Sequence, residues 1–241
     1  MGGNSITIPQ YFKEHGYYTA GMGNVFHRGG ASGYDDPISW TEPFFHGDGA
    51  HWHNASQYSW FAASEEETRE FPLVDDQIAQ KAVETLHMMA PGARNGRNPF
   101  FLAVGFIKPH LPFIFPENFL KYYPLKDIIL PENPYSPADM PEVAWSNFDE
   151  IRIYKDIANK YGYGGINGTQ YPDQVTKKLR RAYYSAISYT DSLVGKVIDT
   201  LEHLGLASNT IISFWGDHGW QLGEHREWCK QTNFELATQH L

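Results

Sequence analysis

Residue types that can bind a cation and an anion come together between Thr210 and Lys230. The apolar run from Ile211 to Trp215 has the composition of a buried strand, and Asp217 and His218 follow it directly. In open α/β sheets, ligands bind beyond the carboxyl ends of the strands, so this pair is a candidate site, with Lys230 nearby in sequence as a partner for an anion. The same Gly-Asp-His-Gly order is also typical of an ordinary capped turn.

Two earlier loops carry similar side chains. His27 follows a strand predicted over residues 17–22, and Lys108 and His110 follow a strand predicted over residues 99–106. If these strands are parallel neighbours of the run before Asp217, all three loops share one edge of a sheet. Histidines and lysines around a carboxylate suit the stabilisation of an anionic transition state, and histidine can give or take a proton. The alternative is three unrelated loops with satisfied polar residues.

Helices predicted between the strands would position these loops. The sequence predicts helices over residues 6–15, with Thr7 as cap, and over 75–90, ended by Pro91-Gly92. The clearest pattern is the apolar spacing of three and four over residues 174–204, which predicts a long core helix ended by Gly205. Helices that alternate with strands indicate an α/β fold, with a central sheet flanked by helices.

Two long stretches, residues 28–73 and 113–172, have no steady period and are expected to be irregular. Asp35-Asp36 could bind a cation, but no strand precedes the pair, so a solvated turn is the preferred interpretation. His46, His51 and His53 have no further ligand at fixed spacing and are interpreted as surface histidines.

Composition restricts the class of protein. The 241 residues carry a net charge of −9, which argues against a nucleic-acid partner, and no apolar run is long enough to cross a membrane. A local cluster of Lys and His can still bind an anionic substrate. Cys229 is the single cysteine, the sequence has no signal-peptide pattern, and the sequons at Asn54 and Asn167 are weak indications of secretion.

Three segments resemble the sulfatase family. Gly21-Met-Gly-Asn-Val-Phe-His27 resembles its Gly-Lys…His motif, and Phe101–Phe113 resembles the segment that carries a substrate-contacting Lys and His. Trp215-Gly-Asp-His-Gly-Trp-Gln-Leu-Gly-Glu-His225, with Glu227-Trp228 and Lys230, is similar to the iduronate 2-sulfatase branch. The resemblance covers nearly the whole chain, from Thr7 to Thr238.

The resemblance implies an alkaline-phosphatase-like α/β fold and hydrolysis of sulfate esters, here of uronic acids in glycosaminoglycans, in a lysosomal or secreted protein. It implies a formylglycine nucleophile made from cysteine and a Ca²⁺ ion that holds the sulfate, with Asp217 and His218 as metal ligands. His27 matches the histidine beside the nucleophile. His110 and Lys230 match groups that bind the sulfate or protonate the leaving oxygen, and Lys108 matches a neighbouring substrate-binding position. The chemistry of an Asp-His pair alone would also allow zinc.

The sequence departs from the family at several points. The Cys-x-Pro-Ser-Arg motif of the nucleophile does not occur, Cys229 cannot replace it, and Asn24 stands where the family has lysine. The two aspartates that complete the metal site are also missing, because Asp35-Asp36 comes too late in the order.

These departures predict that residues 1–241 form one incomplete catalytic domain, a central fragment without sulfatase turnover of its own. Two alternatives stay open at this point. One is a non-catalytic derivative that binds a sulfated glycan, and the other is a phosphoesterase of the same superfamily.

Overall fold

The computed structural model describes residues 5–52, 57–146, 150–161 and 170–238. The chain forms two compact units, each built from several stretches of sequence. The first unit comprises Met1–Gly49, Phe71–Ile107 and Thr190–Ile211, and the second comprises Ala50–Glu70, Lys108–Tyr189 and Ile212–Leu241. Each unit contains a parallel pair of strands with helices beside it, as expected for an α/β fold.

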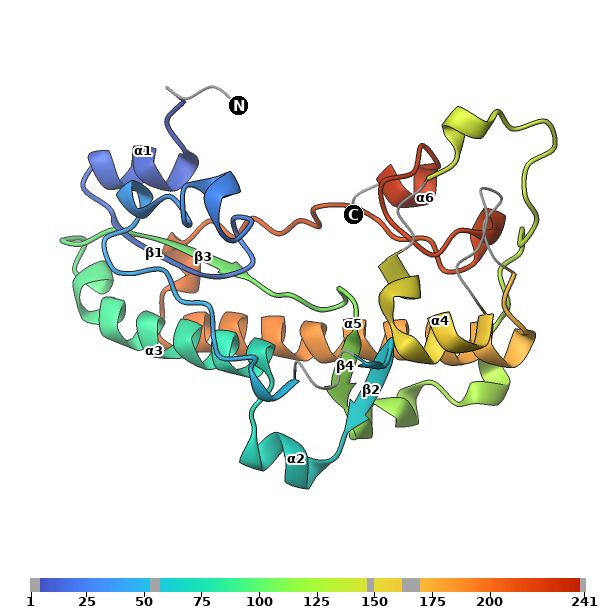
Figure 1. Ribbon diagram of the computed structural model, residues 1–241. Coiled ribbons are helices and arrows are strands. Elements are labelled where there is room, and N and C mark those ends of the chain that lie inside the picture. Colours follow the sequence, from blue (N-terminus) through green and yellow to red (C-terminus); the bar gives the residue numbers. More distant parts are fainter. Residues whose placement is uncertain (1–4, 53–56, 147–149, 162–169, 239–241) are drawn as a thin grey trace. The chain divides into compact units, whose positions relative to one another are not determined.

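A parallel strand pair forms the centre of the first unit (Figure 1). Helix α1 (Ile8–Glu14) leads into β1 (Tyr18–Gly23), and the Thr7 side chain caps α1 by accepting a hydrogen bond from the backbone N–H of Gln10. Strand β3 (Phe100–Gly105) pairs with β1 in register from Tyr18 opposite Phe100 to Gly23 opposite Gly105. The predicted helix, strand and parallel pairing are therefore confirmed for these two strands.

Glycine is required where β1 and β3 end together. Gly23 has a φ of +77°, and a Cβ atom there would lie 1.9 Å from the Gly105 carbonyl oxygen. A Cβ atom on Gly105 would lie 2.4 Å from the Asn24 backbone. The backbone N–H of Asn24 donates to that same Gly105 oxygen at 2.7 Å, so the two loops leave the sheet from adjacent points.

Helix α3 (Val74–Arg94) packs beside this strand pair and is longer than predicted. Its residues Ile78 and Ala82 are buried with Met22 of β1. Its final turns bury Leu86, Met89 and Ala90 against Leu201 and Leu206. The prediction that Pro91-Gly92 ends this helix is wrong, because burial of the residues just before Pro91 stabilises the helix more than the missing N–H weakens it.

The second unit contains elements inside both stretches that were expected to be irregular. Strand β2 (Trp60–Ala63) pairs in parallel with β4 (Phe113–Pro116), and helices α2 (Glu65–Glu70) and α4 (Lys155–Tyr161) belong to the same unit. Each element is only four to seven residues long, too short to show a period in sequence. Short 3₁₀ helices also occur in the second unit, at Glu117–Tyr122, Leu125–Asp127, Glu142–Ala144, Glu150–Ile153 and Glu224–Arg226. Others lie in the first unit, at Gly30–Ser32, Pro37–Ser39 and Ala207–Asn209.

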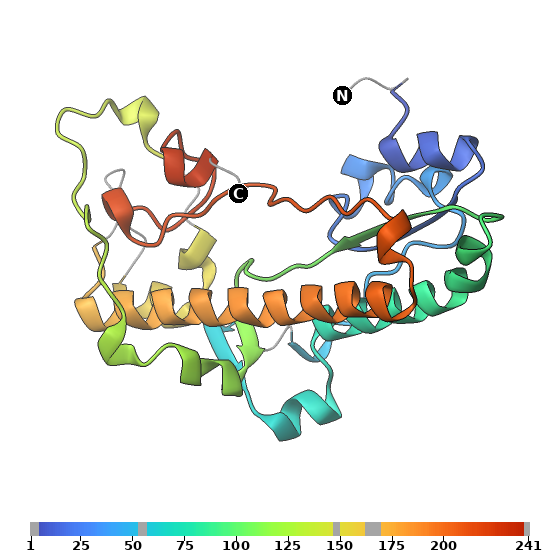
Figure 2. The ribbon, with the colours of Figure 1, turned by 180° about the vertical axis from the view of Figure 1, so that it is seen from behind.

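Helix α5 (Asp173–His203) is the longest element and confirms the clearest prediction from sequence (Figure 2). Its first half belongs to the second unit and its last turns to the first. Residues at steps of three and four along its first part are buried, namely Leu179, Ala182, Ala186, Tyr189 and Leu193, and Leu201 is buried farther on. No helix in the described ranges is long and apolar enough to span a membrane.

The segment from Thr210 to Trp215 contradicts its predicted strand. It pairs with no strand among the described residues, and its apolar side chains are exposed, Ile211 by 97% and Trp215 by 78%. Apolar composition favours a strand only where a neighbouring backbone can pair with it, and β1 and β3 are paired with each other here. Helix α6 (Glu235–Thr238) follows later in the chain.

Candidate functional site

The loop after β3 is held by Lys108. Its ammonium donates hydrogen bonds to the carbonyl oxygens of His110, at 2.6 Å, and Pro112, at 2.9 Å. The two peptide bonds before Pro109 and Pro112 are cis. Lys108 holds the loop that carries His110, and its predicted contact with substrate stays a prediction.

His110, Glu150 and Lys230 meet in the second unit. Lys230 Nζ lies 3.0 Å from His110 Nε2, although 120 residues separate the two along the chain. Glu150 faces both: Oε1 lies 3.4 Å from His110 Nε2, and Oε2 lies 3.2 Å from Lys230 Nζ. The side chains of Lys230 and Glu150 are 14% and 12% exposed and that of His110 is 38% exposed, so this cluster is accessible mainly through the imidazole.

The hydrogen bonds of His110 define the tautomer of its neutral ring. Its Nδ1 lies 2.6 Å from the Leu111 carbonyl oxygen, which can only accept, so Nδ1 carries a proton. In the neutral ring Nε2 is then an acceptor for the Lys230 ammonium. Burial lowers the pKa of His110, and the charges of Lys230 and Lys108 lower it further, while the bond to Leu111 and the charge of Glu150 oppose this fall.

Aromatic rings adjoin the cluster within the same unit. Lys230 Nζ lies 5.9 Å from the centre of the Trp220 ring, and the Phe113 ring meets both Trp220 and Tyr183 edge to face. Burial, and then the charge of Asp217, raise the pKa of Tyr183 to about 12. Trp220 therefore lies beside Lys230 and packs against Phe113, and the charge of Asp217 raises the pKa of Tyr183, which also contacts Phe113.

Asp217 is far more open than the cluster, whereas the His218 side chain, 35% exposed, is about as open as that of His110. The Asp217 side chain is 77% exposed and lies 3.6 Å from His218 Nε2, while His218 Nδ1 lies 2.8 Å from the Gly219 carbonyl oxygen. Within the described part of the chain, no group of three or more His, Cys, Asp or Glu side chains could hold a metal ion. One carboxylate and one imidazole fall well short of the six to eight oxygen ligands that Ca²⁺ takes. The donor set present does not fit a calcium site by itself.

His27 lies in the first unit, after β1. Its Nδ1 is 3.0 Å from the carbonyl oxygen of Arg28, and its partnership with His110 and Lys230 stays a prediction.

Nearby in the first unit, two predictions from sequence are wrong. Asp35 lies in a buried contact 2.7 Å from His46 Nε2 and not in a solvated turn, and His46, which also accepts from Arg28, is no simple surface histidine. Asp36 contacts Thr7 and Ser39. His51 is exposed, as expected, and His53 lies outside the described residues.

A well-packed segment brings Lys230 to the cluster. Trp228 is 1% exposed and packs against Tyr171, and Cys229 is fully buried with its thiol donating to Glu227. Burial raises the pKa of Glu227. Cys229 therefore has a packing role in this segment.

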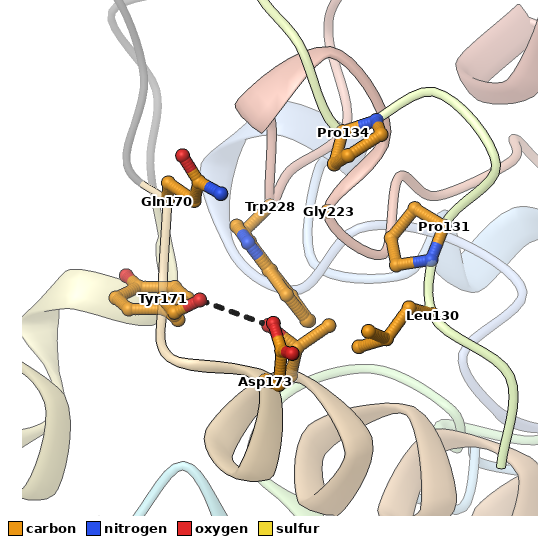
Figure 3. Close-up of a pocket in the computed structure, with 9 residues that line it drawn as sticks. Leu130, Pro131, Pro134, Gln170, Tyr171, Asp173, Gly223 and Trp228 are labelled. Carbon is orange, nitrogen blue, oxygen red and sulfur yellow. Dashed lines mark hydrogen bonds between the residues drawn. The ribbon is translucent and has the colours of Figure 1, made fainter.

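A small pocket beside Trp228 is distinct from this cluster (Figure 3). Its lining includes Tyr171 on one side of the indole and Leu130 and Pro131 on the other. Its volume of about 50 Å³ is room for ordered water and too small for a sugar residue. The cluster around His110 is the better candidate for substrate binding.

Glu150 was not predicted from the sequence as a site residue, and Trp220 had no predicted role in the site. Glu150 lies in the proline-rich stretch without a period, where sequence offers no signal that one acid among several faces a distant histidine. Trp220 belongs to the Gly-Asp-His-Gly-Trp run, so its place in the motif was the available signal.

Comparisons with known proteins agree with these motifs. The chain is 39% identical to iduronate 2-sulfatase of Mus musculus, across 98% of this chain and 44% of that relative, and equally similar to the Homo sapiens protein. It is 30% identical to a sulfatase of Formosa agariphila, across 97% of this chain and 45% of that one. The chain thus spans less than half the length of these relatives.

A solved structure supports the fold. The phosphonate monoester hydrolase of Silicibacter pomeroyi superposes with a TM-score of 0.61 at 18% identity, over 98% of this chain and 52% of its own. This likeness confirms the predicted α/β fold with parallel sheets and helices beside them. The sequence model of the sulfatase family matches residues 3–240, and the chain therefore belongs to the sulfatase family.

Proposed function

We propose that this chain is part of a sulfuric ester hydrolase of the iduronate 2-sulfatase type, which removes sulfate from uronic acid residues of glycosaminoglycans. The observation that carries the proposal is the contact of Lys230 with His110 at 3.0 Å, since both belong to motifs that resemble the sulfate-binding groups of that branch. We also propose a lysosomal or secreted location, on the resemblance to that branch.

The electrostatics of the cluster support an anionic ligand. The chain as a whole carries a charge of −9, so a sulfated sugar would be repelled by most of its surface. Lys230 is largely buried, and a charged hydrogen bond there is stronger than one in water. A sulfate oxygen beside Lys230 would receive such a bond.

His110 can serve two functions in this proposal. As a neutral ring it presents a lone pair on Nε2, and as an imidazolium it can donate the Nε2 proton to the oxygen of the leaving sugar. Trp220 and Phe113 would limit the access of water on one side of the ligand. Lys108 holds the loop that carries His110, and its predicted contact with the substrate remains part of the proposal.

The nucleophile and the metal set the limits of this proposal. The sequence contains no Cys-x-Pro-Ser-Arg motif, so we propose that these 241 residues have no sulfatase turnover alone. Calcium enters only as the ion that the family resemblance implies, with Asp217 and His218 as two of its ligands. Because the donors present do not fit that ion, none of the steps above uses it.

One alternative has a specific observation in its favour. Asn24 replaces the family's lysine and the nucleophile motif is missing, which together favour a non-catalytic protein that binds a sulfated glycan. A phosphoesterase of the same superfamily is a further alternative, and hydrolysis of a phosphate ester would favour it.

Heparin-affinity chromatography tests the binding proposal. We expect the wild-type chain to elute at higher salt than the double variant His110→Ala, Lys230→Ala, because the variant loses the local cations that overcome the net negative charge. A second double variant, Lys121→Ala, Lys126→Ala, removes exposed lysines of the same unit and serves as the control for charge. Equal retention of all three proteins would overturn the proposal.

A turnover assay tests the proposed lack of activity. The 241-residue chain is expected to leave a 2-sulfated iduronate substrate intact. Release of sulfate by this chain would contradict the proposed lack of turnover.

A further inference from the structure

Glu150 is unexpected at a site proposed to bind sulfate. Its carboxylate is 12% exposed and lies between the two groups assigned to the anion, so it repels the proposed ligand. Oε2 makes no hydrogen bond to any described residue and meets Lys230 as an ion pair at 3.2 Å. A buried carboxylate that costs binding energy must contribute something else.

The geometry around His110 indicates what that contribution is. In the neutral ring Nδ1–H donates to Leu111, and Nε2 accepts from Lys230. Glu150 Oε1 then receives no proton from the ring, although it lies only 3.4 Å from Nε2.

Protonation of Nε2 reverses this arrangement. The Lys230 ammonium can no longer donate to Nε2, and the new N–H faces the Glu150 carboxylate. Lys230 keeps its ion pair with the other oxygen of Glu150, so one carboxylate stands between two cations. The charged groups that face the imidazole are Glu150, Lys230 and Lys108, and Glu150 is the one among them that favours the imidazolium.

We propose that Glu150 is a positioning residue, which keeps His110 and Lys230 against each other and accepts the Nε2–H of His110 when the imidazole is protonated. The inference rests on the proposed function for the role of the His110 proton. It concerns the protonation and orientation of His110 only.

Imidazole NMR of the 241-residue chain tests the proposal without a ligand. Long-range ¹H–¹⁵N spectra of histidine report the tautomer and the pKa of each ring, and the signal of His110 is identified by its loss in His110→Gln. In the wild type we expect the neutral ring to carry its proton on Nδ1. A proton on Nε2 in the neutral wild-type ring would overturn the proposal with no variant needed.

Two substitutions then separate charge from packing. Glu150→Gln keeps the shape and removes the charge, and it is expected to lower the pKa of His110 further. Glu150→Asp keeps the charge and is expected to leave that pKa closer to the wild-type value. Glu132→Gln, an exposed acid of the same unit, controls for net charge and should leave it unchanged.

The outcomes are distinct. An unchanged pKa in Glu150→Gln, or equal changes in the Gln and Asp variants, would overturn the proposal. If Glu150→Gln does not fold, a pKa of His110 in Glu150→Asp equal to the wild-type value supports the role of the charge, and a neutral wild-type ring with its proton on Nε2 still overturns the proposal. Titration of the same samples with inorganic sulfate tests the proposed function separately. If sulfate leaves the His110 signal unmoved while the variants behave as expected, the proposed function fails and the role of Glu150 stands.

Discussion

The two halves of the candidate site differ in how well their side chains are packed and held by contacts. His110, Lys230 and Glu150 contact one another, and Lys230 and Glu150 are mostly buried, whereas Asp217 is 77% exposed and contacts only His218, at 3.6 Å, among the ion pairs of the described residues. The first group is held by a lysine-tied loop and by a segment anchored on Trp228. The second follows an exposed apolar run that has no strand partner among the described residues. A preorganised anion site needs both of the chain segments that carry its side chains to be held in place, and only the first group has this support.

Trp228→Ala should have the largest effect on this difference. The indole is 1% exposed and packs against Tyr171, so its removal leaves a cavity beneath the segment that carries Lys230. We expect a loss of about 3–5 kcal/mol in the free energy of unfolding, measured by urea denaturation. A loss as small as that of a surface substitution would show that Trp228 does not anchor the segment that carries Lys230.

Ligand binding should separate the two halves directly. Lys230→Gln is expected to weaken binding of a sulfated monosaccharide about tenfold, because a charge-assisted hydrogen bond is removed. Asp217→Asn, measured by calorimetry in the presence of a chelator, should leave the affinity unchanged or slightly higher. The distinction between the halves fails if Asp217→Asn weakens binding as much as Lys230→Gln.

The dependence of stability on pH should report the burial of His110. Its pKa is lower in the folded chain than the ordinary 6.5, so the unfolded chain binds more protons in this range. The contribution of His110 is therefore fully present above about pH 6.5 and is lost as the pH falls from there through the lower pKa of the folded chain. We expect acidification to destabilise the wild type more than His110→Gln, by comparison of urea midpoints. Equal losses would indicate that His110 titrates as in the unfolded chain.

Trp215→Ser should have the smallest effect. This indole is 78% exposed and lies only thirteen residues from the buried Trp228. We expect the free energy of unfolding to change by less than about 0.5 kcal/mol, together with weaker binding of a hydrophobic dye. A large loss of stability would show that the run from Ile211 to Trp215 is packed in solution.

Long elements with a strong period could be predicted from sequence, and short or context-dependent ones could not. Helix α5 and strand β3 lie within one residue of their predicted bounds, because the sequence shows the apolar face of the helix as a period and the strand as a continuous apolar run. Strand β2 is four residues long and shows no such pattern. The run after Thr210 has strand composition, yet a strand also needs a neighbour, which composition does not specify.

The candidate site could be predicted in part, for a related reason. The motifs identified His110 and Lys230, and the structure brings them together. Glu150 could not be found, because its importance depends on a contact across forty residues of irregular chain. The contact of Lys108 with backbone oxygens likewise depends on the path of the loop, not on the type of residue.

The tight approach of Gly23 to Gly105 limits how this edge of the sheet can vary. A methyl group at position 23 would lie 1.9 Å from the Gly105 carbonyl oxygen, so even alanine would push the two strand ends apart. Residues farther along the two loops are not restricted by this contact. New specificities could therefore arise in the loops, while the hinge point from which they diverge stays glycine.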